Sequence, residues 1–455
     1  MDVRAEAVNR IFQYRIPPSF GEKIKIGHRV LIPFGRRRIE GYVVELSSQL
    51  QVEEGKLKSV LQLLDPEPII LPSLVELAVW MEQTYVGLLS EALQYMLPPA
   101  FRFGKERVGA KTAQFATLLV RSPQLRKNAT AQRRVVEILQ KESQLLATDL
   151  ISKARTSYQV LRSLEEQGII ALGTTTLERK VEWDRIPDPK PSLTREQEDA
   201  VEAIQGESKG LKRPVLLHGV TGSGKTEVYL NVIADVIREG RQAIVLVPEI
   251  ALTPQTLNRF AARFGDRVSV LHSGLSLGER FDQWWKTYHG EVDVVVGARS
   301  AVFAPTQNLG LIVLDEEHEG TYKQEEGSIR YHTRDVAIKR CELVEAQVIL
   351  GSATPALESY HQALQGSFRL AELTKRVEAR PLPTVRVVDM RKQFEQGNRS
   401  MFSTELKTAL GELAQTNDQA IILLNRRGFS RFVLCRECGE VLECPNCQVS
   451  LTYHQ

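Results

Sequence analysis

Short apolar runs alternate with helical patterns along the chain from Thr194 onwards. The runs are "PVLLHG", "AIVLVP", "VSVLH", "DVVVGA", "LIVLDE" and "VILGSATP". Uninterrupted apolar strands separated by helices are typical of a parallel sheet that helices cover on both faces. We therefore predict an α/β fold with such a sheet. The runs "VRVVDM" and "AIILLNRRG" come next, and we interpret the second as a further strand.

The pattern before Thr194 is different and predicts two smaller regions. "HRVLIPFG" and "IEGYVVEL" are β-rich, and the helix "PSLVELAVWMEQTY" follows with Leu74, Leu77, Ala78 and Met81 on one face. Residues 128–180 give three short helical patterns and then a β-wing, "ALGTTTLERKVEW". That order suits a winged helix, and a plain three-helix domain fits it nearly as well. The prolines of "DRIPDPKPSLT" mark a linker.

The composition is that of a globular protein and limits the choice of partners. Of 455 residues, 42% are apolar and 25% are charged. No apolar run approaches the length of a membrane span, and the start "MDVRAEAVNRIF" is charged. We expect no membrane partner, no secretory signal and a cytoplasmic location. The net charge is only +3, so a surface for a polyanion must be local, such as the run from Arg36 to Arg38; a solvated loop is the simpler interpretation of that run.

One glycine-rich stretch predicts a phosphate-binding loop. It is "GVTGSGKT", made of Gly219, Val220, Thr221, Gly222, Ser223, Gly224, Lys225 and Thr226. It follows the strand "PVLLH" and opens a helix, where backbone N–H groups and the helix N-terminus favour an anion. We expect Lys225 to reach the β- and γ-phosphates of ATP and Thr226 to ligate Mg²⁺. A chance glycine-rich turn is the alternative.

An acidic run predicts the catalytic carboxylates. "LIVLDEEH" is an apolar strand that delivers Asp315, Glu316, Glu317 and His318 to its carboxyl end, where ligands of open α/β sheets bind. We expect Asp315 to hold Mg²⁺ through water and Glu316 to polarise the attacking water. A solvated acidic loop is the alternative, and the phosphate-binding loop upstream on the same sheet favours catalysis.

With these two motifs in place, the chain resembles the superfamily 2 helicases. "LTREQEDAVEAI" is similar to their adenine-reading segment, with Gln197 as the reader, and "GSATP" to the motif that links nucleotide state to DNA. The resemblance is closer to the replication-restart helicases. It is carried by "GVTGSGKTEVY", "LVPEIALTPQ", "LHSGLSLGER", "GARSAVFAP", "DEEHEGTYKQEEGSIRYHTRD" and "LLNRRGF".

The resemblance implies an ATP-dependent 3′→5′ DNA helicase that recognises stalled or abandoned forks. Such an enzyme unwinds the lagging-strand arm and initiates primosome assembly, using ATP and Mg²⁺. The implied partners are forked and single-stranded DNA, primosome proteins, single-strand-binding protein and the replicative helicase loader, in a nucleoid-associated location. Two alternatives stay open, namely another superfamily 2 DNA translocase and a fork-binding module that binds ATP without turning it over.

The resemblance also implies two DNA-binding elements. Phe12, Gln13 and Tyr14 correspond to a domain that captures the 3′ end of a nascent strand, and Arg36 of the basic run is a further DNA-binding candidate. The family commonly has an Asp where this chain has Gln13, and an amide can still hydrogen-bond a base edge or a sugar hydroxyl. Ordinary strand residues are an equally good interpretation.

The second element corresponds to an aromatic-rich loop that senses DNA. It holds Tyr322, Lys323, Arg330, Tyr331 and His332, and such residues can stack on bases or meet phosphate. A surface loop with scattered aromatic residues is the alternative. We expect the pair Trp284 and Trp285 to pack in the core and Cys341 to be a buried apolar residue.

The chain has five cysteines, and four of them are near its end. Cys435, Cys438, Cys444 and Cys447 form two CxxC pairs, which suit Zn²⁺ better than disulfides in the cytoplasm. The gap between the pairs is short for one zinc ribbon. The resemblance implies two zinc ions per full-length chain, each completed by a later pair, so we expect this chain to be truncated within the zinc region. All four thiolates closing on one ion is the alternative.

Together these expectations give five regions. They are an N-terminal 3′-end DNA-binding domain at 1–104, a winged helix at 105–185, an ATP-binding helicase lobe similar to RecA at 190–390, the start of a second lobe at 391–434, and a partial zinc-binding region at 435–455.

Overall fold

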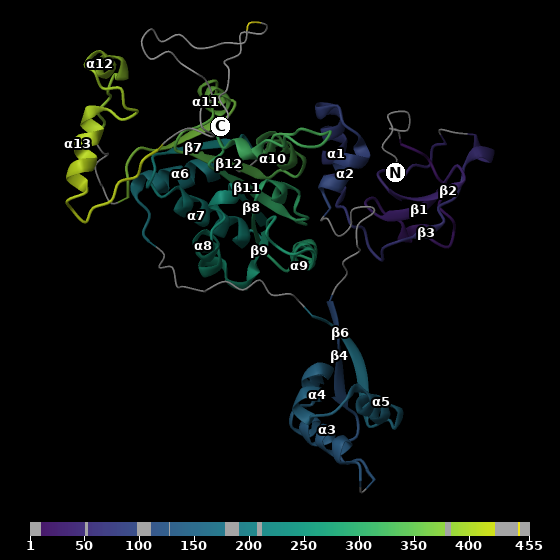
Figure 1. The fold of residues 1–455 in the computed structure, drawn as a ribbon. Coiled ribbons are helices and arrows are strands. Elements are labelled where there is room, and N and C mark those ends of the chain that lie inside the picture. The colour runs from purple at the N-terminus through teal and green to yellow at the C-terminus, as the bar shows by residue number, and fades with distance from the viewer. Residues whose placement is uncertain are drawn as a thin grey trace. The chain divides into compact units, whose positions relative to one another are not determined.

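The computed structural model describes residues 11–50, 53–97, 111–126, 128–177, 191–206, 212–377, 384–423 and 445. Its largest element is a seven-stranded sheet in the order β13-β7-β12-β11-β8-β10-β9 (Figure 1). The strands are β7 (Val215–Gly219), β8 (Gln242–Leu246), β9 (Val268–Leu271), β10 (Val294–Gly297), β11 (Leu309–Asp315), β12 (Gln347–Ser352) and β13 (Arg369–Leu373). All pairs are parallel, which confirms the predicted parallel sheet.

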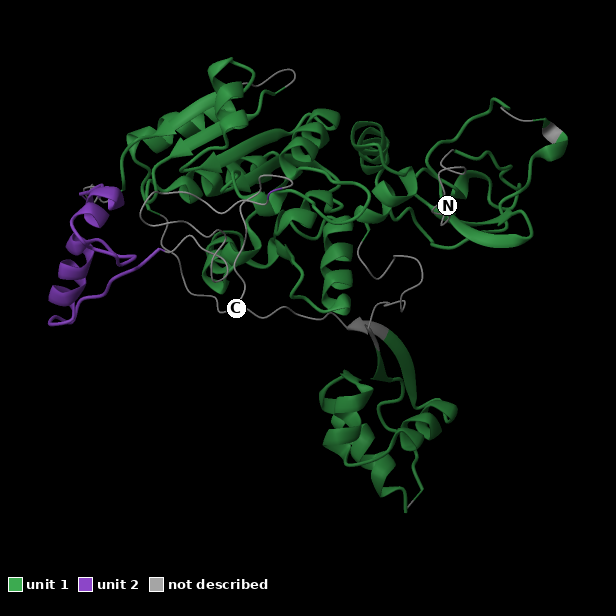
Figure 2. Ribbon diagram, turned by 45° about the horizontal axis from the view of Figure 1, so that its top comes forward, with its two compact units in different colours: residues 1–379 green, residues 380–455 purple. Residues whose placement is uncertain are grey.

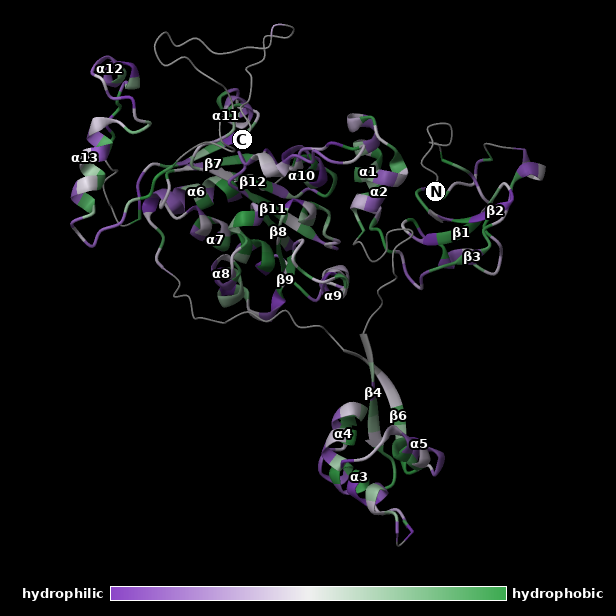
Figure 3. Ribbon diagram, in the orientation of Figure 1, coloured by the Kyte–Doolittle hydropathy of each residue, from purple (hydrophilic) through white to green (hydrophobic). Residues whose placement is uncertain are grey.

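Helices cover both faces of this sheet. One face packs on α6 (Arg195–Gln205), α7 (Lys225–Arg238) and α8 (Pro254–Phe264). The other packs on α9 (Leu277–Tyr288), α10 (Thr333–Leu343) and α11 (Leu357–Leu364). Along β10, Val294 and Val296 point to the first core and Val295 to the second, so the strand is apolar at every position. The same strands stand out as hydrophobic in Figure 3.

Two residues that we expected in the core are there. Trp284 is 3% exposed and stacks on Tyr288. Cys341 is also buried, and this burial raises the pKa of its thiol to about 12. The expectations for Trp284 and Cys341 are confirmed, whereas Trp285 is only partly buried and packs against the edge of the core.

A helical hairpin from the N-terminal part of the chain completes the second core. It consists of α1 (Pro72–Tyr85) and α2 (Leu89–Tyr95), and α1 contacts α10 (Figure 1). The predicted apolar face of α1 is buried, and it shares one core with Ile329 and Val336 of the lobe built on the seven-stranded sheet. The hairpin is therefore packed as part of that lobe, although the chain reaches it much earlier.

The residues before the hairpin form a small antiparallel sheet. Its strands are β1 (Arg29–Phe34), β2 (Arg37–Tyr42) and β3 (Gln62–Leu63), in the order β2-β1-β3. Ile24, Val30, Ile32 and Val60 form its core. The guanidinium of Arg29 donates two hydrogen bonds, of 2.9 and 2.8 Å, to the Asp65 carboxylate, which ties the strand to the segment that leads into α1.

Residues 111–177 form three helices and a second antiparallel sheet. The helices are α3 (Thr130–Lys141), α4 (Ala147–Ala154) and α5 (Tyr158–Glu166), and the strands are β4 (Lys111–Leu118), β5 (Gln144–Leu146) and β6 (Ile170–Leu177). The predicted wing is β6, and it pairs along its whole length with β4, which the sequence pattern did not reveal. This sheet favours the winged helix over the plain three-helix alternative.

A second compact unit covers residues 380–455 (Figure 2). It contains α12 (Met390–Glu395) and α13 (Thr404–Leu413). Asn398 and Gln393 join these helices through hydrogen bonds to each other and to Thr404. The expected strand beginning at Ala420 is not formed at 420–423, the part of it that the structure describes. The four cysteines of the predicted zinc region lie outside the described residues.

Short 3₁₀ helices connect these elements. They are η2 (Gly21–Lys23), η3 (Glu54–Lys56), η5 (Glu249–Ala251), η6 (Gly265–Arg267), η7 (Arg299–Phe303) and η8 (Gly320–Tyr322). Among the helices that the structure describes, none combines the length and the apolar character that crossing a membrane requires.

Candidate functional site

The predicted phosphate-binding loop joins β7 to α7. Gly222 and Gly224 have φ angles of +83° and +79°, a left-handed conformation that glycine adopts without a steric penalty. The Ser223 N–H donates to the Val220 carbonyl at 3.0 Å, which closes the loop. The loop therefore ends at the N-terminus of α7, where an anion is favoured.

Lys225 is the first residue of α7, and its side chain turns back into the loop. It is 9% exposed, and its Nζ donates to the Gly219 carbonyl at 3.0 Å. Nζ also lies 4.0 Å from Oε1 of Glu316. The fold thus brings the lysine and an acidic residue of the predicted catalytic pair together at the carboxyl edge of the sheet.

Asp315 ends β11 and is held by two buried tyrosines. The Tyr229 hydroxyl donates to its Oδ1 at 3.0 Å, and the Tyr322 hydroxyl lies 2.7 Å from its backbone carbonyl oxygen. Burial raises the pKa of the Asp315 carboxyl, and the nearby charge of Glu316 raises it further, while the Tyr229 hydrogen bond opposes both. Thr226 lies on the first turn of α7. A hydroxyl and a carboxylate are ligands that suit Mg²⁺.

Glu316 adopts an unusual backbone conformation. Its φ is +47°, which is uncommon for a residue with a side chain and is found at functional sites where the surroundings hold it. Its Oε2 lies 3.7 Å from Nδ1 of His318. That same nitrogen lies 2.7 Å from the Ser352 hydroxyl, which belongs to "GSATP". The acidic run and the "GSATP" motif are therefore in direct contact.

Glu317 is the residue whose environment the sequence did not reveal. It is 1% exposed. Its two carboxylate oxygens accept from the Ala356 N–H at 2.6 Å and the Ser359 hydroxyl at 2.8 Å, and Arg334 lies 3.8 Å away. A buried carboxylate with these partners ties the acidic run to α11 and α10. Only its place in an acidic run could have drawn attention to Glu317, and no local pattern marked Tyr229 or Ser359.

Gln197 is buried and joins α6 to the phosphate-binding loop. Its Oε1 accepts from the Thr194 N–H at 2.8 Å, and its Nε2 donates to the Ser223 carbonyl at 2.8 Å. Thr194 and Gln197 thus form a capping box that starts α6. Both ends of the amide are hydrogen-bonded within the protein, and its predicted contact with adenine remains a prediction.

The predicted aromatic-rich loop is only partly a surface loop. Tyr322 and Tyr331 are each 1% exposed. The Tyr322 hydroxyl also lies 2.9 Å from the Leu246 carbonyl oxygen, and the Tyr331 ring packs edge-on against Tyr95 and Phe303. Neither ring offers a face to a base, so the expectation that these two stack on DNA is wrong for this conformation. The positions of aromatic residues along a loop sequence do not distinguish a buried ring from an exposed one.

The polar residues of the same loop have different surroundings. Lys323 and Arg330 are exposed, which suits contacts with phosphate. His332 is half-buried and caps α10, because its Nδ1 accepts from the Arg334 N–H at 3.2 Å. Burial lowers the pKa of His332, and the positive charge of Arg334 lowers it further, which favours the neutral ring.

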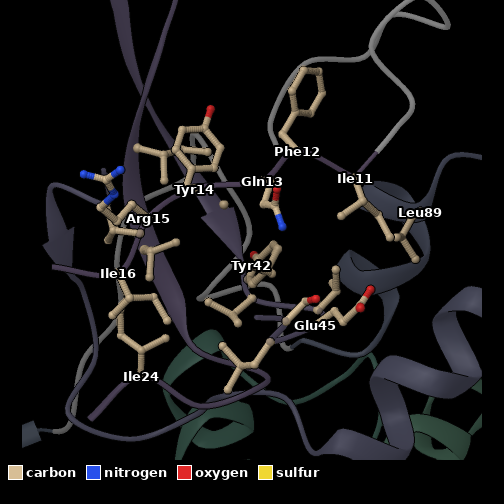
Figure 4. Close-up of a pocket in the computed structure, with 18 of the residues that line it drawn as sticks. Ile11, Phe12, Gln13, Tyr14, Arg15, Ile16, Ile24, Tyr42, Glu45 and Leu89 are labelled. Carbon is tan, nitrogen blue, oxygen red and sulfur yellow. The ribbon is translucent and has the colours of Figure 1, made fainter. Parts of the chain in front are cut away.

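A separate cavity of about 460 Å³ lies over the N-terminal sheet (Figure 4). Phe12, Gln13 and Tyr14 line it together, and the carboxylate of Glu45 lines it as well. The Gln13 amide donates to the Gln49 carbonyl at 2.6 Å, and the Tyr14 hydroxyl donates to the Pro33 carbonyl at 3.1 Å. Arg36 is exposed and is not among the lining residues. Phe12, Gln13 and Tyr14, the residues of the predicted 3′-end pocket, therefore share one cavity.

The helical hairpin connects this pocket to the aromatic-rich loop. Leu89 and Leu93 of α2 line the pocket. On the loop side, the Ser328 hydroxyl donates to the Glu91 carboxylate, and Ile329 is fully buried beside Gly87. One short hairpin thus contacts both the pocket and the loop that follows Glu316.

This contact predicts a specific steric effect. A Cβ on Gly87 would overlap the Ile329 side chain, so Gly87→Val should lower the free energy of unfolding by about 1–3 kcal/mol. Urea denaturation measures the change. Gly55→Ala is the matched control, because nothing lies within 4 Å of a Cβ there. Equal stability of the Gly87→Val variant and the unchanged protein would show that the hairpin does not hold the loop.

Comparisons with known proteins cover the whole chain. A family model described as "3'DNA-binding domain (3'BD)" matches residues 2–98, and one described as "DEAD/DEAH box helicase" matches residues 194–363. The chain is 39% identical to the "Replication restart protein PriA" of Bacillus subtilis over 100% of its own length and 65% of that protein. The chain is also 36% identical to the protein of the same name from Synechocystis, and this match covers 98% of the chain and 63% of that protein.

One solved structure, "Structure of RecG bound to three-way DNA junction", matches 40% of the chain and 24% of that protein at 25% identity and a TM-score of 0.31, which is too low to support a conclusion. The chain spans less than two thirds of the relatives named above. Both family models match in the expected order and the identity runs along the full length of the chain, so the chain is similar throughout to the replication restart protein PriA.

Proposed function

We propose that this chain carries the ATP-binding lobe and fork-binding domains of an ATP-dependent 3′→5′ DNA helicase of replication restart. The observation that carries the proposal is the meeting of Lys225 and Glu316 at the carboxyl edge of the sheet, 4.0 Å apart. In the proposed function, the protein binds abandoned forks in the cytoplasm at the nucleoid. It opens the lagging-strand arm and starts primosome assembly with primosome proteins, single-strand-binding protein and the replicative helicase loader.

The arrangement supports hydrolysis of ATP by three groups of the chain. Lys225 binds the β- and γ-phosphates from within the loop, and the backbone N–H groups of the loop hold them. Thr226 would ligate Mg²⁺ and Asp315 would hold it through water, and the bound ion would neutralise charge on the phosphate oxygens. Glu316 orients the attacking water and accepts its proton. Its left-handed backbone fixes the carboxylate beside Lys225.

The contacts around Asp315 support coupling between DNA and ATP. The Tyr322 hydroxyl reaches the Asp315 carbonyl oxygen, and Tyr322 belongs to the loop whose exposed residues Lys323 and Arg330 suit phosphate. A shift of this loop on DNA would move Asp315 through that contact. Glu317 transmits the same shift to α11 through Ser359. DNA bound at this loop then controls ATP hydrolysis through the contacts of Tyr322 and Glu317, in addition to any effect of the N-terminal pocket.

The pocket of Phe12, Gln13 and Tyr14 is proposed to hold the 3′ end of a nascent strand. An aromatic ring can stack on the terminal base, and the Gln13 amide and the Glu45 carboxylate are polar groups that a terminal hydroxyl can meet. A carboxylate in the pocket also disfavours a terminal phosphate. Arg36, outside the pocket, is proposed to contact the phosphate backbone.

Phe12→Ala should weaken binding to a fork with a free 3′ end about tenfold, because a stacked base contributes about 1–3 kcal/mol. Fluorescence anisotropy measures the affinity for forks with a free 3′ end and for forks with a 3′ phosphate. The whole chain is used because α1 and α2, which follow the N-terminal sheet, pack in the core of the ATP-binding lobe. Arg36→Ala is the control, because losing a phosphate contact should weaken both forks equally and lower the salt dependence. Equal loss on both forks for Phe12→Ala would contradict the 3′-end role.

We also propose that Cys435, Cys438, Cys444 and Cys447 bind zinc as halves of two sites. Four thiolates in CxxC pairs are a donor set that fits the ion. A pair of thiolates leaves two positions of a tetrahedral ion open, so this polypeptide should lose its zinc to a mild chelator. Native mass spectrometry before and after chelation measures the loss. One tightly held zinc per chain would instead show that the four cysteines close on a single ion.

A second candidate function is a fork-binding module that binds ATP without turning it over. The observation that favours it is that the described residues contain a single seven-stranded lobe. A steady-state ATPase assay with forked DNA distinguishes the two candidates, because only the helicase turns ATP over.

A further inference from the structure

Residues 374–377, which we call the 374–377 segment, lie against the phosphate-binding loop. They follow β13, the edge strand that runs parallel to β7, so the carboxyl end of β13 lies beside the loop. Two backbone hydrogen bonds join the chain there. The Val220 N–H donates to the Leu373 carbonyl at 3.1 Å, and the Val377 N–H donates to the Gly222 carbonyl at 3.1 Å.

The first turn of α6 fixes the same segment from its other side. The Glu196 carboxylate accepts from the N–H and the hydroxyl of Thr374, both at 2.8 Å, and from the Lys375 N–H at 3.2 Å. The Thr374 hydroxyl lowers the pKa of Glu196. The next residue, Gln197, holds Ser223 of the loop. One turn of helix therefore positions the loop and the 374–377 segment together.

Two side chains of this segment face the loop glycines. The Arg376 stem passes Gly222, with Cγ and Cδ 3.8 and 3.9 Å from the position of a Cβ there. Its Nε is buried and has no hydrogen-bond partner among the described residues. Val377 is 50% exposed, and its Cγ2 lies 3.1 Å from the Cβ position of Gly224, which the Gln197 amide also adjoins. A buried donor without a partner calls for an explanation.

We propose that Arg376 is a nucleotide-binding residue that contacts the ATP held by the loop. This inference rests on the proposed function. A guanidinium has five donors, binds phosphate oxygens in pairs and also stacks on the face of a base. Val377 adds an apolar surface beside Gln197. Arg376 and Val377 then form one wall of the nucleotide site, and neither side chain is marked by a motif in the sequence.

The test is the affinity of the 455-residue chain for ATP with Mg²⁺ and without DNA, by isothermal titration calorimetry. Arg376→Ala should weaken binding about tenfold, which corresponds to about 1.4 kcal/mol, and Arg376→Lys should weaken it less. Lys375→Ala is the matched control, because it removes the same charge from the same segment while keeping the backbone bond to Glu196. It should bind as the unchanged chain does.

Inorganic tripolyphosphate separates the two possible contacts. If Arg376 contacts the phosphates, Arg376→Ala should weaken the binding of tripolyphosphate as much as the binding of ATP. If it meets the base, only ATP binding should weaken. Unchanged affinity for both ligands in a variant that keeps its thermal stability would overturn the inference, and so would an equal loss in Lys375→Ala. Loss of ATP binding in Lys225→Ala but not in Arg376→Ala would leave the proposed function intact and remove only Arg376 from the site.

Discussion

Lys225→Ala should abolish ATP binding or turnover and leave the affinity for forked DNA unchanged. The Lys225 ammonium is buried in the loop, so its removal takes away the only positive side chain that the loop sequence supplies for phosphate. The pocket of Phe12 and the exposed residues Lys323 and Arg330 are separate from it. We expect ATP hydrolysis to fall about a hundredfold or more, as for the loss of other preorganised charge-stabilising groups.

Calorimetry with ATP and anisotropy with a fork in nucleotide-free buffer measure the two affinities. The fork titration is the internal control for folding. An equal loss of fork affinity in Lys225→Ala would show that the ATP site and the DNA contacts cannot be separated as proposed.

Glu316→Gln should keep the affinity for ATP and lower its hydrolysis about a hundredfold to ten-thousandfold, the usual range for a lost general base. The amide has the shape of the carboxylate and leaves Asp315 in place, but it cannot accept the proton of the attacking water. Steady-state turnover at saturating ATP and fork measures the change, and ATP titration measures the affinity.

Glu325→Gln is the matched control for this substitution. Glu325 is an exposed acidic residue of the same loop region, so the identical chemical change there should leave turnover as it is. Near-normal turnover in Glu316→Gln would remove Glu316 from the catalytic role.

The sequence predicted the sheet and the ATP motifs because both are local signals. Buried parallel strands are apolar at every position, as along β10, and the loop from Gly219 to Thr226 is defined by neighbours in the chain. The capping box of Thr194 and Gln197 is equally local. Such features depend on a few consecutive residues and can be recognised without a structure.

The parts that the sequence did not reveal depend on pairs of residues far apart in the chain. Tyr229 meets Asp315 only because α7 packs on β11, and Arg376 meets Gly222 only because β13 pairs with β7. The hairpin of α1 and α2 joins the core of a lobe that begins a hundred residues later. The burial of Tyr322 and Tyr331 was not revealed either, since the order of residues in a loop carries no information about burial.

The most direct measurement is ATP hydrolysis by this chain with and without forked DNA. The account predicts that the fork raises turnover, and that Lys225→Ala and Glu316→Gln each remove the fork-stimulated part. ATP binding without any turnover on the fork would contradict the helicase and leave the fork-binding module. Turnover that persists in Lys225→Ala would contradict the site itself.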